Sequence, residues 1–260
     1  MTTPIAVRPA VPRFYKYSSA QYLERLKPVL LEHKLYLPTL DQLNDPADGR
    51  PKLAALEPGQ MVSFLVAAMV RDNPSMSEAD RQRHTMILQH NLGVHGMEFF
   101  HSELTRLLHR DLESFRVYSM SKRWDNLALW AKYAADHTGY CLEFVNEGPL
   151  FEHAKEVIYA EAFPMDVTNR EHRNGYWFFM KKPEWSNEEE VRLVRPRTPN
   201  NVPGVIIQPE WLARIILGRG MSAENERQIR EWASERIPPL QVVKARYNQV
   251  TQGIELVIDP

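Results

Sequence analysis

The chain carries one cysteine, Cys141, in 260 residues. A single cysteine excludes an intrachain disulfide framework and a zinc site made of several cysteines, and it is typical of a reducing cytoplasm. No apolar run approaches the ~20 residues of a membrane span, and the longest one, residues 61–70, is flanked by charge. Residues 1–12 hold three prolines and no apolar core of the signal-peptide type. We therefore expect a cytoplasmic protein without a membrane partner.

A strong excess of either charge is also missing, because the formal net charge is −1 at pH 7. This balance gives no bulk signal for a nucleic-acid binder. The chain has no Walker A, G-x-G-x-x-G, G-x-S-x-G or H-E-x-x-H motif, so the common signals for nucleotide loops, serine hydrolases and zinc peptidases are absent. Gly218-Arg219-Gly220 bears a weak likeness to a phosphate loop, but a tight turn before a helix at Ser222 explains it more simply.

Helix and strand patterns are both present, but they do not alternate regularly, which argues against a doubly wound parallel sheet. We expect an α+β fold with a mixed, mostly antiparallel sheet, packed helices and a helical insertion over residues 52–114. A proline-rich arm of residues 1–12 precedes this single domain of residues 13–260. The predicted strands are 13–17, 34–37, 115–121, 139–145, 156–159, 190–194, 215–217, 240–246 and 253–258. The predicted helices are 20–33, 59–70, 77–91, 97–108, 126–136 and 222–236.

Residues 117–144 concentrate hydroxyl, aromatic and ionisable side chains in one predicted strand–helix–strand unit. This mixture favours a polar pocket walled by aromatic rings, which is how small-ligand sites are built. Asp125 is the expected N-cap of the helix, and Trp130, Tyr133 and His137 follow at i, i+3 and i+7. The stripe predicts either core packing or a site in which His137 acts as an acid or base near neutral pH.

A second segment, residues 185–194, places Glu188, Glu190 and Arg192 at i, i+2 and i+4 beside Trp185. On a strand this spacing puts all three on one face. Two carboxylates and a guanidinium are costly to bury unless they pair with each other or with a ligand. The segment therefore predicts either a catalytic carboxylate at the strand's end or an edge strand with a solvated polar face and one salt bridge.

Three further groups of residues are candidates for ligand contacts. Ser119 and Ser121 share a strand face, where their hydroxyls would bind a ligand or simply line a half-exposed strand. The first strand offers Arg13, Tyr15, Lys16 and Tyr17 for a phosphate or a stacked base, or for ordinary aromatic packing. The turn with Asn44, Asp45 and Asp48 offers oxygen ligands to a cation, or side chains that cap their own backbone. It has too few ligands for a defined calcium loop, and we predict no metal.

The order of these motifs resembles a widespread bacterial family of unknown function. Its signatures are a Y-K-Y strand, an F-N-D-P-x-D turn, S-x-S, L-W-x-x-Y-A-x-x-H-x-G-x-C-L-E-F and W-x-x-E-x-E-x-R. They correspond here to residues 15–17, 43–48, 119–121, 129–144 and 185–192, and an I-I-L-G element follows at 215–218. The likeness covers about residues 14–220, with Leu43 where the family usually has Phe. The family name implies no activity.

More distantly, a basic and aromatic first strand, an S-x-S strand and a later E-x-E strand are similar to the motif order of the ADP-ribosyltransferase fold. This resemblance implies NAD as a substrate. It also implies that the last Glu of E-x-E polarises the ribose 2′-hydroxyl while the nicotinamide bond breaks through an oxocarbenium-like state. Glu190 would then be catalytic and Glu188 would orient the acceptor.

The same resemblance assigns the remaining candidates. The phosphates would bind Arg13 or Lys16, the two serines Ser119 and Ser121 would brace the site, and Trp130 or Tyr133 would stack against a ring. Tyr15, Tyr17 and Arg192 complete the expected cofactor-binding set, while Trp185 and the Asn44–Asp48 turn are further pocket candidates.

These observations give one leading hypothesis and two alternatives. The first is an NAD-consuming transferase or glycohydrolase, such as a toxin or phage-defence effector, which needs a small-molecule ligand. The second is a nucleic-acid-processing or nucleic-acid-binding defence module with a divalent metal, which the near-neutral charge disfavours. It would use Lys122, Arg123, Lys181, Lys182, Asp45, Asp48, Glu188 and Glu190. The third is a non-catalytic ligand sensor whose pocket is the Trp130, Tyr133 and His137 stripe.

Overall fold

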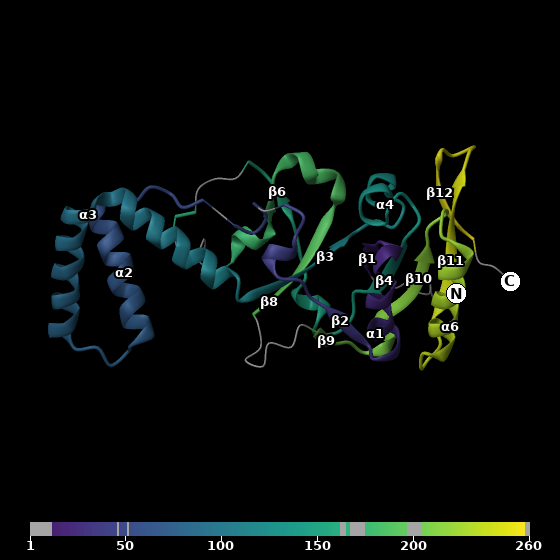
Figure 1. The fold of residues 1–260 in the computed structure, drawn as a ribbon, viewed down its shortest axis with the longest axis horizontal. Coiled ribbons are helices and arrows are strands. Elements are labelled where there is room, and N and C mark those ends of the chain that lie inside the picture. Colours follow the sequence, from purple (N-terminus) through teal and green to yellow (C-terminus); the bar gives the residue numbers. More distant parts are fainter. Residues whose placement is uncertain are drawn as a thin grey trace, which may run out of the picture. The chain divides into compact units, whose positions relative to one another are not determined.

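The computed structural model describes residues 12–45, 47–50, 52–161, 165–166, 175–196 and 204–257 (Figure 1). Except for Pro12, the predicted arm of residues 1–12 lies outside the described residues. The chain divides into two compact units. Unit 1 comprises Met1–Pro38, Arg116–Val157 and Glu184–Pro260, and unit 2 comprises Thr39–Phe115 and Ile158–Pro183. The helical insertion predicted over residues 52–114 is thus part of a larger unit that also takes in residues 158–183.

Unit 1 is built on an eight-stranded sheet in the order β12-β11-β10-β4-β1-β3-β8-β5. Adjacent strands pair antiparallel at β12–β11, β10–β4, β4–β1, β1–β3 and β8–β5, and β10–β11 pair parallel. The predicted α+β class with a mixed, mostly antiparallel sheet is therefore confirmed. The strands are β1 (Arg13–Ser18), β3 (Phe115–Ser121), β4 (Tyr140–Val145), β5 (Lys155–Glu156), β8 (Glu190–Pro196), β10 (Leu212–Leu217), β11 (Gln241–Asn248) and β12 (Gly253–Val257).

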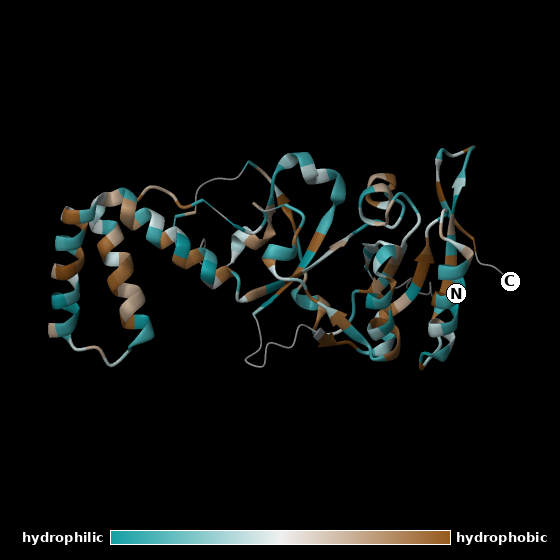
Figure 2. Ribbon diagram, in the orientation of Figure 1, coloured by the Kyte–Doolittle hydropathy of each residue, from teal (hydrophilic) through white to brown (hydrophobic). Residues whose placement is uncertain are grey.

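Side chains alternate between the two faces of this sheet, as the period of a strand requires. One face, here the α6 face, packs against α1 (Leu26–Leu31) and α6 (Ala223–Glu235) in a large core that includes Phe144 and Ile215. The other, here the α4 face, packs against α4 (Leu127–Tyr133) in a smaller core that includes Tyr17 and Ile216. Figure 2 shows that β10 is largely hydrophobic whereas α6 is mainly hydrophilic, because α6 buries only one stripe.

Local sequence signals set several of these elements correctly. The helix predicted over 222–236 is α6, and the Ser222 hydroxyl caps it by accepting a hydrogen bond from the Asn225 amide. The strands predicted over 240–246 and 253–258 are β11 and β12, which pair antiparallel. The predicted helix 20–33 is instead a 3-10 segment, η1 (Ala20–Arg25), followed by α1, with Tyr22 in a non-helical conformation. A second small sheet pairs β2 (Lys34–Tyr36) with β9 (Gly204–Ile206). The unit also holds the short 3-10 segments η3 (Phe151–His153) and η6 (Pro209–Trp211).

Unit 2 contains α2 (Pro58–Asp72) and α3 (Glu78–Leu112), which pack around a small core with Met61 and Leu104. The two helices predicted over 77–91 and 97–108 are a single helix, α3, which kinks at Gly96. Gly96 has a φ of 78°, a conformation that glycine adopts without the steric penalty of a Cβ. The unit also holds η2 (Leu40–Gln42), η4 (Tyr176–Phe179) and the parallel pair β6 (Ile158–Tyr159) and β7 (Met180–Lys181). Within the described ranges, no helix combines the length and the apolar character needed to cross a membrane.

Candidate functional site

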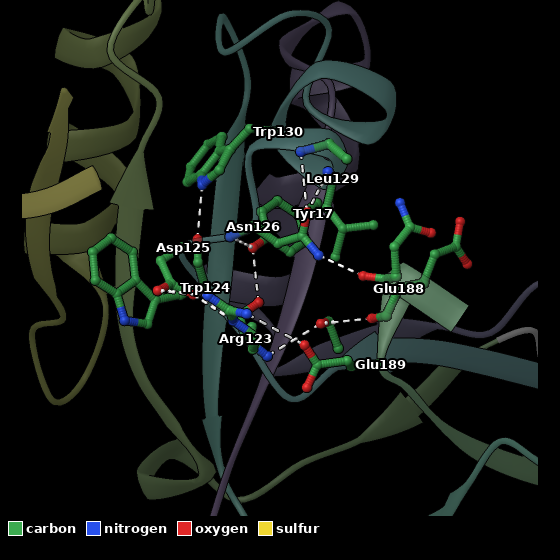
Figure 3. A network of polar contacts seen from close by, with 12 residues as sticks. Tyr17, Arg123, Trp124, Asp125, Asn126, Leu129, Trp130, Glu188 and Glu189 are labelled. Atoms are coloured by element: carbon green, nitrogen blue, oxygen red, sulfur yellow. Dashed lines mark hydrogen bonds and ion pairs between the residues drawn. The ribbon is translucent and has the colours of Figure 1, made fainter. Parts of the chain in front are cut away.

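The loop between β3 and α4 is fixed by its own polar side chains (Figure 3). The Asn126 carboxamide oxygen accepts hydrogen bonds from the amides of Ala128 (3.0 Å) and Leu129 (3.2 Å), so Asn126 is the N-cap of α4. The prediction of Asp125 as N-cap was wrong, because its carboxylate is held by the Arg123 guanidinium at 2.9 and 3.1 Å. Hydrogen bonding to Arg123 lowers the pKa of the Asp125 carboxyl below its ordinary value.

Helix α4 ends at Tyr133, three residues earlier than predicted. Ala135, Asp136 and His137 all have positive φ values, of 46°, 50° and 65°, so the chain turns out of the helix before His137. The predicted stripe of Trp130, Tyr133 and His137 on one helix face was therefore wrong. The His137 ring stacks on Trp130, with centroids 6.0 Å apart and planes 9° apart.

Trp130 and His137 are core residues. Trp130 is fully buried, and its indole N–H donates to the Trp124 carbonyl oxygen at 2.7 Å. Tyr17 meets the same indole edge-on at 5.2 Å and donates its hydroxyl to the Arg123 carbonyl at 2.7 Å. Burial lowers the pKa of His137, and Arg219 lowers it further; burial also raises the pKa of Tyr17. Trp130 is therefore a core residue, and the prediction that a ligand ring stacks on it is wrong, because no part of its side chain is exposed.

The three glutamates at residues 188–190 differ in conformation. Strand β8 begins at Glu190, whereas Glu188 closes the 3-10 segment η5 (Pro183–Glu188) and Glu189 between them has a φ of 43°. Glu188 is therefore not a strand residue, and its prediction on a shared strand face was wrong. Glu190 and Arg192 do share the α4 face, because Val191 and Leu193 between and beside them lie in the core of the α6 face.

Glu190 and Arg192 form a buried bidentate ion pair. Arg192 Nε donates to Glu190 Oε1 at 2.7 Å, and a terminal guanidinium nitrogen donates to Oε2 at 2.9 Å. Glu190 is 4% exposed and Arg192 1%. The alternative of a solvated polar edge is therefore wrong for this pair, although the salt bridge it included is present. Two charges buried together require this geometry, since desolvation otherwise outweighs their attraction.

Glu188 is also buried, and it meets two side chains of α4. The Tyr133 hydroxyl donates to Glu188 Oε1 at 2.7 Å, and Lys132 Nζ lies 3.2 Å from the same oxygen. Lys132 Nζ also lies 3.4 Å from the centroid of the Trp185 ring, a cation–π contact. The predicted pocket residues Tyr133, Trp185 and Glu188 are thus brought together. Sequence reasoning missed Lys132, because a lysine on a short helix looks like a solvated surface residue.

Ser121 connects β3 to the glutamate segment. Its hydroxyl accepts from the Arg123 amide at 3.1 Å and donates to the Glu188 carbonyl at 2.8 Å, and the side chain is 3% exposed. The Lys122 amide donates to the Glu189 carbonyl at 3.0 Å, and the Asn126 carboxamide donates to the Asn187 carbonyl at 2.6 Å. The backbone around Glu188 is therefore fixed by the loop that leads into α4.

The candidate residues of the first strand, β1, lie on both faces of the sheet. Tyr15 and Tyr17 lie on the α4 face, whereas Lys16 lies on the α6 face, where Nζ donates to the Ser119 carbonyl at 2.9 Å. Lys16 Nζ also sits 5.2 Å from the centroid of the Tyr118 ring. Lys16 therefore does not share a face with Arg13, Tyr15 and Tyr17, the other candidates of this strand, because successive strand residues point to opposite faces. Arg13 remains on the α4 face, where it contacts Glu143.

Cross-strand register places a row of polar residues across the α4 face. Glu143 of β4 pairs with Arg214 of β10 on one side and with Tyr15 of β1 on the other, and Tyr15 pairs with Ser121 of β3. Burial, and then Glu143, raises the pKa of Tyr15 to about 12. Sequence reasoning missed Glu143 and Arg214 as site residues. The alternation of Glu143 with Cys141 in the Cys-Leu-Glu-Phe strand was a signal for Glu143, whereas Arg214 had none.

The turn with Asn44, Asp45 and Asp48 belongs to unit 2. Asp45 Oδ1 accepts from the Ala47 amide at 2.9 Å, which confirms the alternative of backbone capping for Asp45. Asp48 is buried and lies 3.8 Å from Lys181 Nζ. Across the described ranges, no group of three or more His, Cys, Asp or Glu side chains is arranged to hold a metal ion.

Three of the cations proposed for nucleic-acid contacts are paired within the protein. Lys181 pairs with Asp48, Lys122 Nζ lies 3.0 Å from Glu156, and Arg123 is held by Asp125. The contacts of these three cations do not favour the nucleic-acid alternative, because each one is already neutralised by a carboxylate.

Comparison with protein-family models, with curated proteins and with solved structures finds no significant match for this chain. The family resemblance of the motifs stays a prediction. The geometry of the α4 face is the basis for a functional proposal.

Proposed function

We propose that unit 1 binds NAD and breaks the bond between its nicotinamide and ribose, transferring ADP-ribose to water or to an acceptor. One observation carries the proposal. The first strand, the S-x-S strand and the strand that begins at Glu190 lie far apart in the sequence, yet they are the neighbours β1, β3 and β8 in the sheet. The ADP-ribosyltransferase resemblance requires these three segments to meet at one site, so their adjacency supports it.

The chemistry needs a negative charge beside the breaking bond. When the ribose C1′–nitrogen bond breaks, its electron pair stays with the nicotinamide nitrogen and neutralises it, while positive charge develops on the ribose. A fixed carboxylate in a poorly solvated site stabilises such a charge without reorganisation. Water or an acceptor then attacks C1′ and loses a proton. In the proposal, Glu190 supplies the carboxylate, and Arg192 keeps it oriented.

Glu188 and its neighbours suit the acceptor side of the reaction. Its carboxylate accepts hydrogen bonds from Tyr133 and Lys132, and Ser121 fixes its backbone. A carboxylate can accept about four hydrogen bonds through its two oxygens. In the proposal, Glu188 orients the attacking nucleophile and accepts its proton. The rings of Tyr133 and Trp185 provide apolar surface next to this carboxylate, of the kind that lines small-ligand sites.

The test compares three proteins: the parent, Glu190→Gln and Glu189→Gln. Glu189 is the control for loss of a glutamate charge in this segment, because it is the adjacent glutamate, its side chain is 39% exposed, and its ion pair with Arg123 is long, at 3.5 Å. The loss of the buried ion pair in Glu190→Gln is controlled by the unfolding measurement on each variant. NAD binding is measured by calorimetry, and free nicotinamide by chromatography. We expect all three to bind NAD. The parent and Glu189→Gln should release nicotinamide, and Glu190→Gln should lose at least about 100-fold in rate, as removal of one transition-state contact does.

Two outcomes would contradict the proposal. If the parent neither binds NAD nor releases nicotinamide, the NAD hypothesis is wrong. If NAD stabilises the parent without any release, the protein is a ligand sensor and the alternative without catalysis is correct. Thermal unfolding of each variant shows whether a loss of activity reflects a loss of the fold.

A further inference from the structure

A cluster of four side chains lies on the α4 face at β1, β4 and β10, away from Glu188 and Glu190. We call Arg13, Tyr15, Glu143 and Arg214 the arginine cluster. Glu143 is fully buried at its centre. Arg13 contacts Glu143 Oε1, and Arg214 Nε donates to Glu143 Oε2 at 2.5 Å. Each oxygen of one carboxylate is therefore bound by a different arginine, from the strand on either side.

The arginine cluster has more positive than negative charge. Two guanidinium groups meet one carboxylate, which leaves one positive charge in excess. The Glu143 side chain is 0% exposed, whereas the side chains of Arg13 and Arg214 are 46% and 25% exposed. The carboxylate thus lies beneath two cations that reach solvent. One arginine is enough to neutralise a buried glutamate, so the second adds a positive charge that Glu143 does not balance.

The donors of the cluster also exceed its acceptors. A guanidinium carries five N–H donors in a rigid planar fork. Within the described part of the chain, Glu143 receives one hydrogen bond from each arginine. Burial raises the pKa of Tyr15 to about 12, and the charges of Glu143 and of both arginines act on it as well. The Tyr15 phenol therefore stays protonated and is a further hydrogen-bond donor. The core around α4 uses neighbouring positions of the same strands, namely Tyr17, Cys141 and Ile216.

We propose that the arginine cluster binds a phosphate group. Arginine forks match phosphate oxygens in pairs, and a ligand with more than one negative charge would neutralise the excess that Glu143 leaves. Strands β1 and β8 are two positions apart in the sheet, about 10 Å at the usual spacing. A nucleotide bound by its diphosphate at the cluster would have to span at least this distance to place its ribose at Glu190. The identity of that nucleotide rests on the proposed function, but the binding of the anion does not.

Calorimetry of the full chain with inorganic pyrophosphate and with ADP-ribose tests this site. Arg214→Gln should weaken both ligands by at least about 10-fold, as expected for loss of a charge-assisted hydrogen bond. Arg227→Gln is the matched control, because Arg227 is an exposed arginine of α6 on the other face and its loss changes the net charge equally. Its effect should be less than about twofold at physiological salt, where distant surface charges are screened.

Glu143→Gln separates a binding role from a structural one. Removing the internal competitor leaves two unneutralised guanidinium groups, so pyrophosphate should bind several-fold more tightly to this variant than to the parent. A purely structural cluster would give no such gain. If Glu143→Gln does not fold, the comparison of Arg214→Gln with Arg227→Gln decides the question.

The two ligands distinguish the source of the phosphate. Tighter binding of ADP-ribose than of pyrophosphate, with both weakened in Arg214→Gln, supports a nucleotide ligand; equal binding supports a free phosphate compound. The inference is wrong if pyrophosphate does not bind the parent, or if Arg214→Gln binds it as the parent does. A parent that binds pyrophosphate through Arg214 but releases no nicotinamide from NAD would disprove the proposed function and leave the phosphate site standing.

Discussion

Removal of Arg192 should destabilise unit 1 more than any surface substitution. Arg192→Met keeps an unbranched side chain of similar volume but leaves the carboxylate of Glu190 buried without the guanidinium that binds both of its oxygens. Both residues are at least 95% buried. Breaking a buried ion pair from one side costs about 3–5 kcal/mol, because the remaining charge is desolvated and uncompensated. We expect a loss of that size in the free energy of unfolding at pH 7.

The same reasoning predicts a partial rescue. In the double variant Glu190→Gln/Arg192→Met neither member of the pair is charged, so most of the loss should be recovered, leaving a deficit of about 1–2 kcal/mol from imperfect hydrogen bonding. Urea unfolding followed by tryptophan fluorescence measures all three differences against the parent. Lys122→Met is the control for an ion pair near the surface, because Lys122 and Glu156 are 40% and 69% exposed. Its effect should stay below about 1 kcal/mol.

A double variant that is no more stable than Arg192→Met would refute this reasoning. It would mean that Arg192 stabilises the sheet through its packing and not through the charge of Glu190. A loss of less than about 1 kcal/mol in Arg192→Met would refute it as well, since breaking a buried ion pair from one side costs about 3–5 kcal/mol.

Two further predictions concern the turn that follows α4. A Cβ on Gly218 would lie 2.1 Å from the His137 carbonyl oxygen, so Gly218→Ala should lower the free energy of unfolding by about 1–3 kcal/mol. Gly93 in α3 is the control: a Cβ there would meet no atom within 4 Å, so Gly93→Ala should raise the free energy of unfolding by up to about 1 kcal/mol. Equal effects of the two substitutions in urea unfolding would contradict the close backbone contact at Gly218. Burial lowers the pKa of His137 below 6.5, so the unfolded state binds its proton more readily and stability should fall as the pH falls through about 6.5. In His137→Leu this loss between pH 7 and pH 5 should be smaller, and an unchanged pH profile would show that His137 is not its source.

The sequence predicted the elements of unit 1 well where periodicity is regular. Alternation identified β1, β3, β4 and β8, and it correctly paired Glu190 with Arg192 on one face. It failed at residues whose backbone breaks the period. Glu189 has a positive φ, so Glu188 does not continue the strand, although its spacing matches a strand. Such a conformation is uncommon for a residue with a side chain, and no local sequence rule predicts it.

The prediction of where α4 ends failed for the same reason. Residues 134–136 are Ala-Ala-Asp, which read as helix, and Gly139 was the only stop signal. The backbone leaves the helix before His137, because three successive residues adopt positive φ values. Tertiary hydrogen bonds stabilise this turn, including that from the Gly220 amide to the His137 carbonyl at 2.9 Å. These partners are distant in sequence, so the local pattern contains no trace of them.

Register explains why the arginine cluster was missed. Whether Arg214 meets Glu143 depends on how β10 aligns with β4, and a shift by one residue would send every side chain to the opposite face. An irregularity between Leu212 and Arg214 sets this alignment. The family resemblance pointed to Arg13 and to the serines, but it carried no information about a cation on the strand at residues 212–217.

The release of nicotinamide from NAD, measured side by side for the parent, Glu190→Gln and Glu189→Gln, tests the central claim most directly. The account predicts release by the parent and by Glu189→Gln, and at least about a 100-fold slower release by a folded Glu190→Gln that still binds NAD. Release at the same rate by the parent and by Glu190→Gln would contradict the role of Glu190, and no release by the folded parent would contradict the proposed reaction.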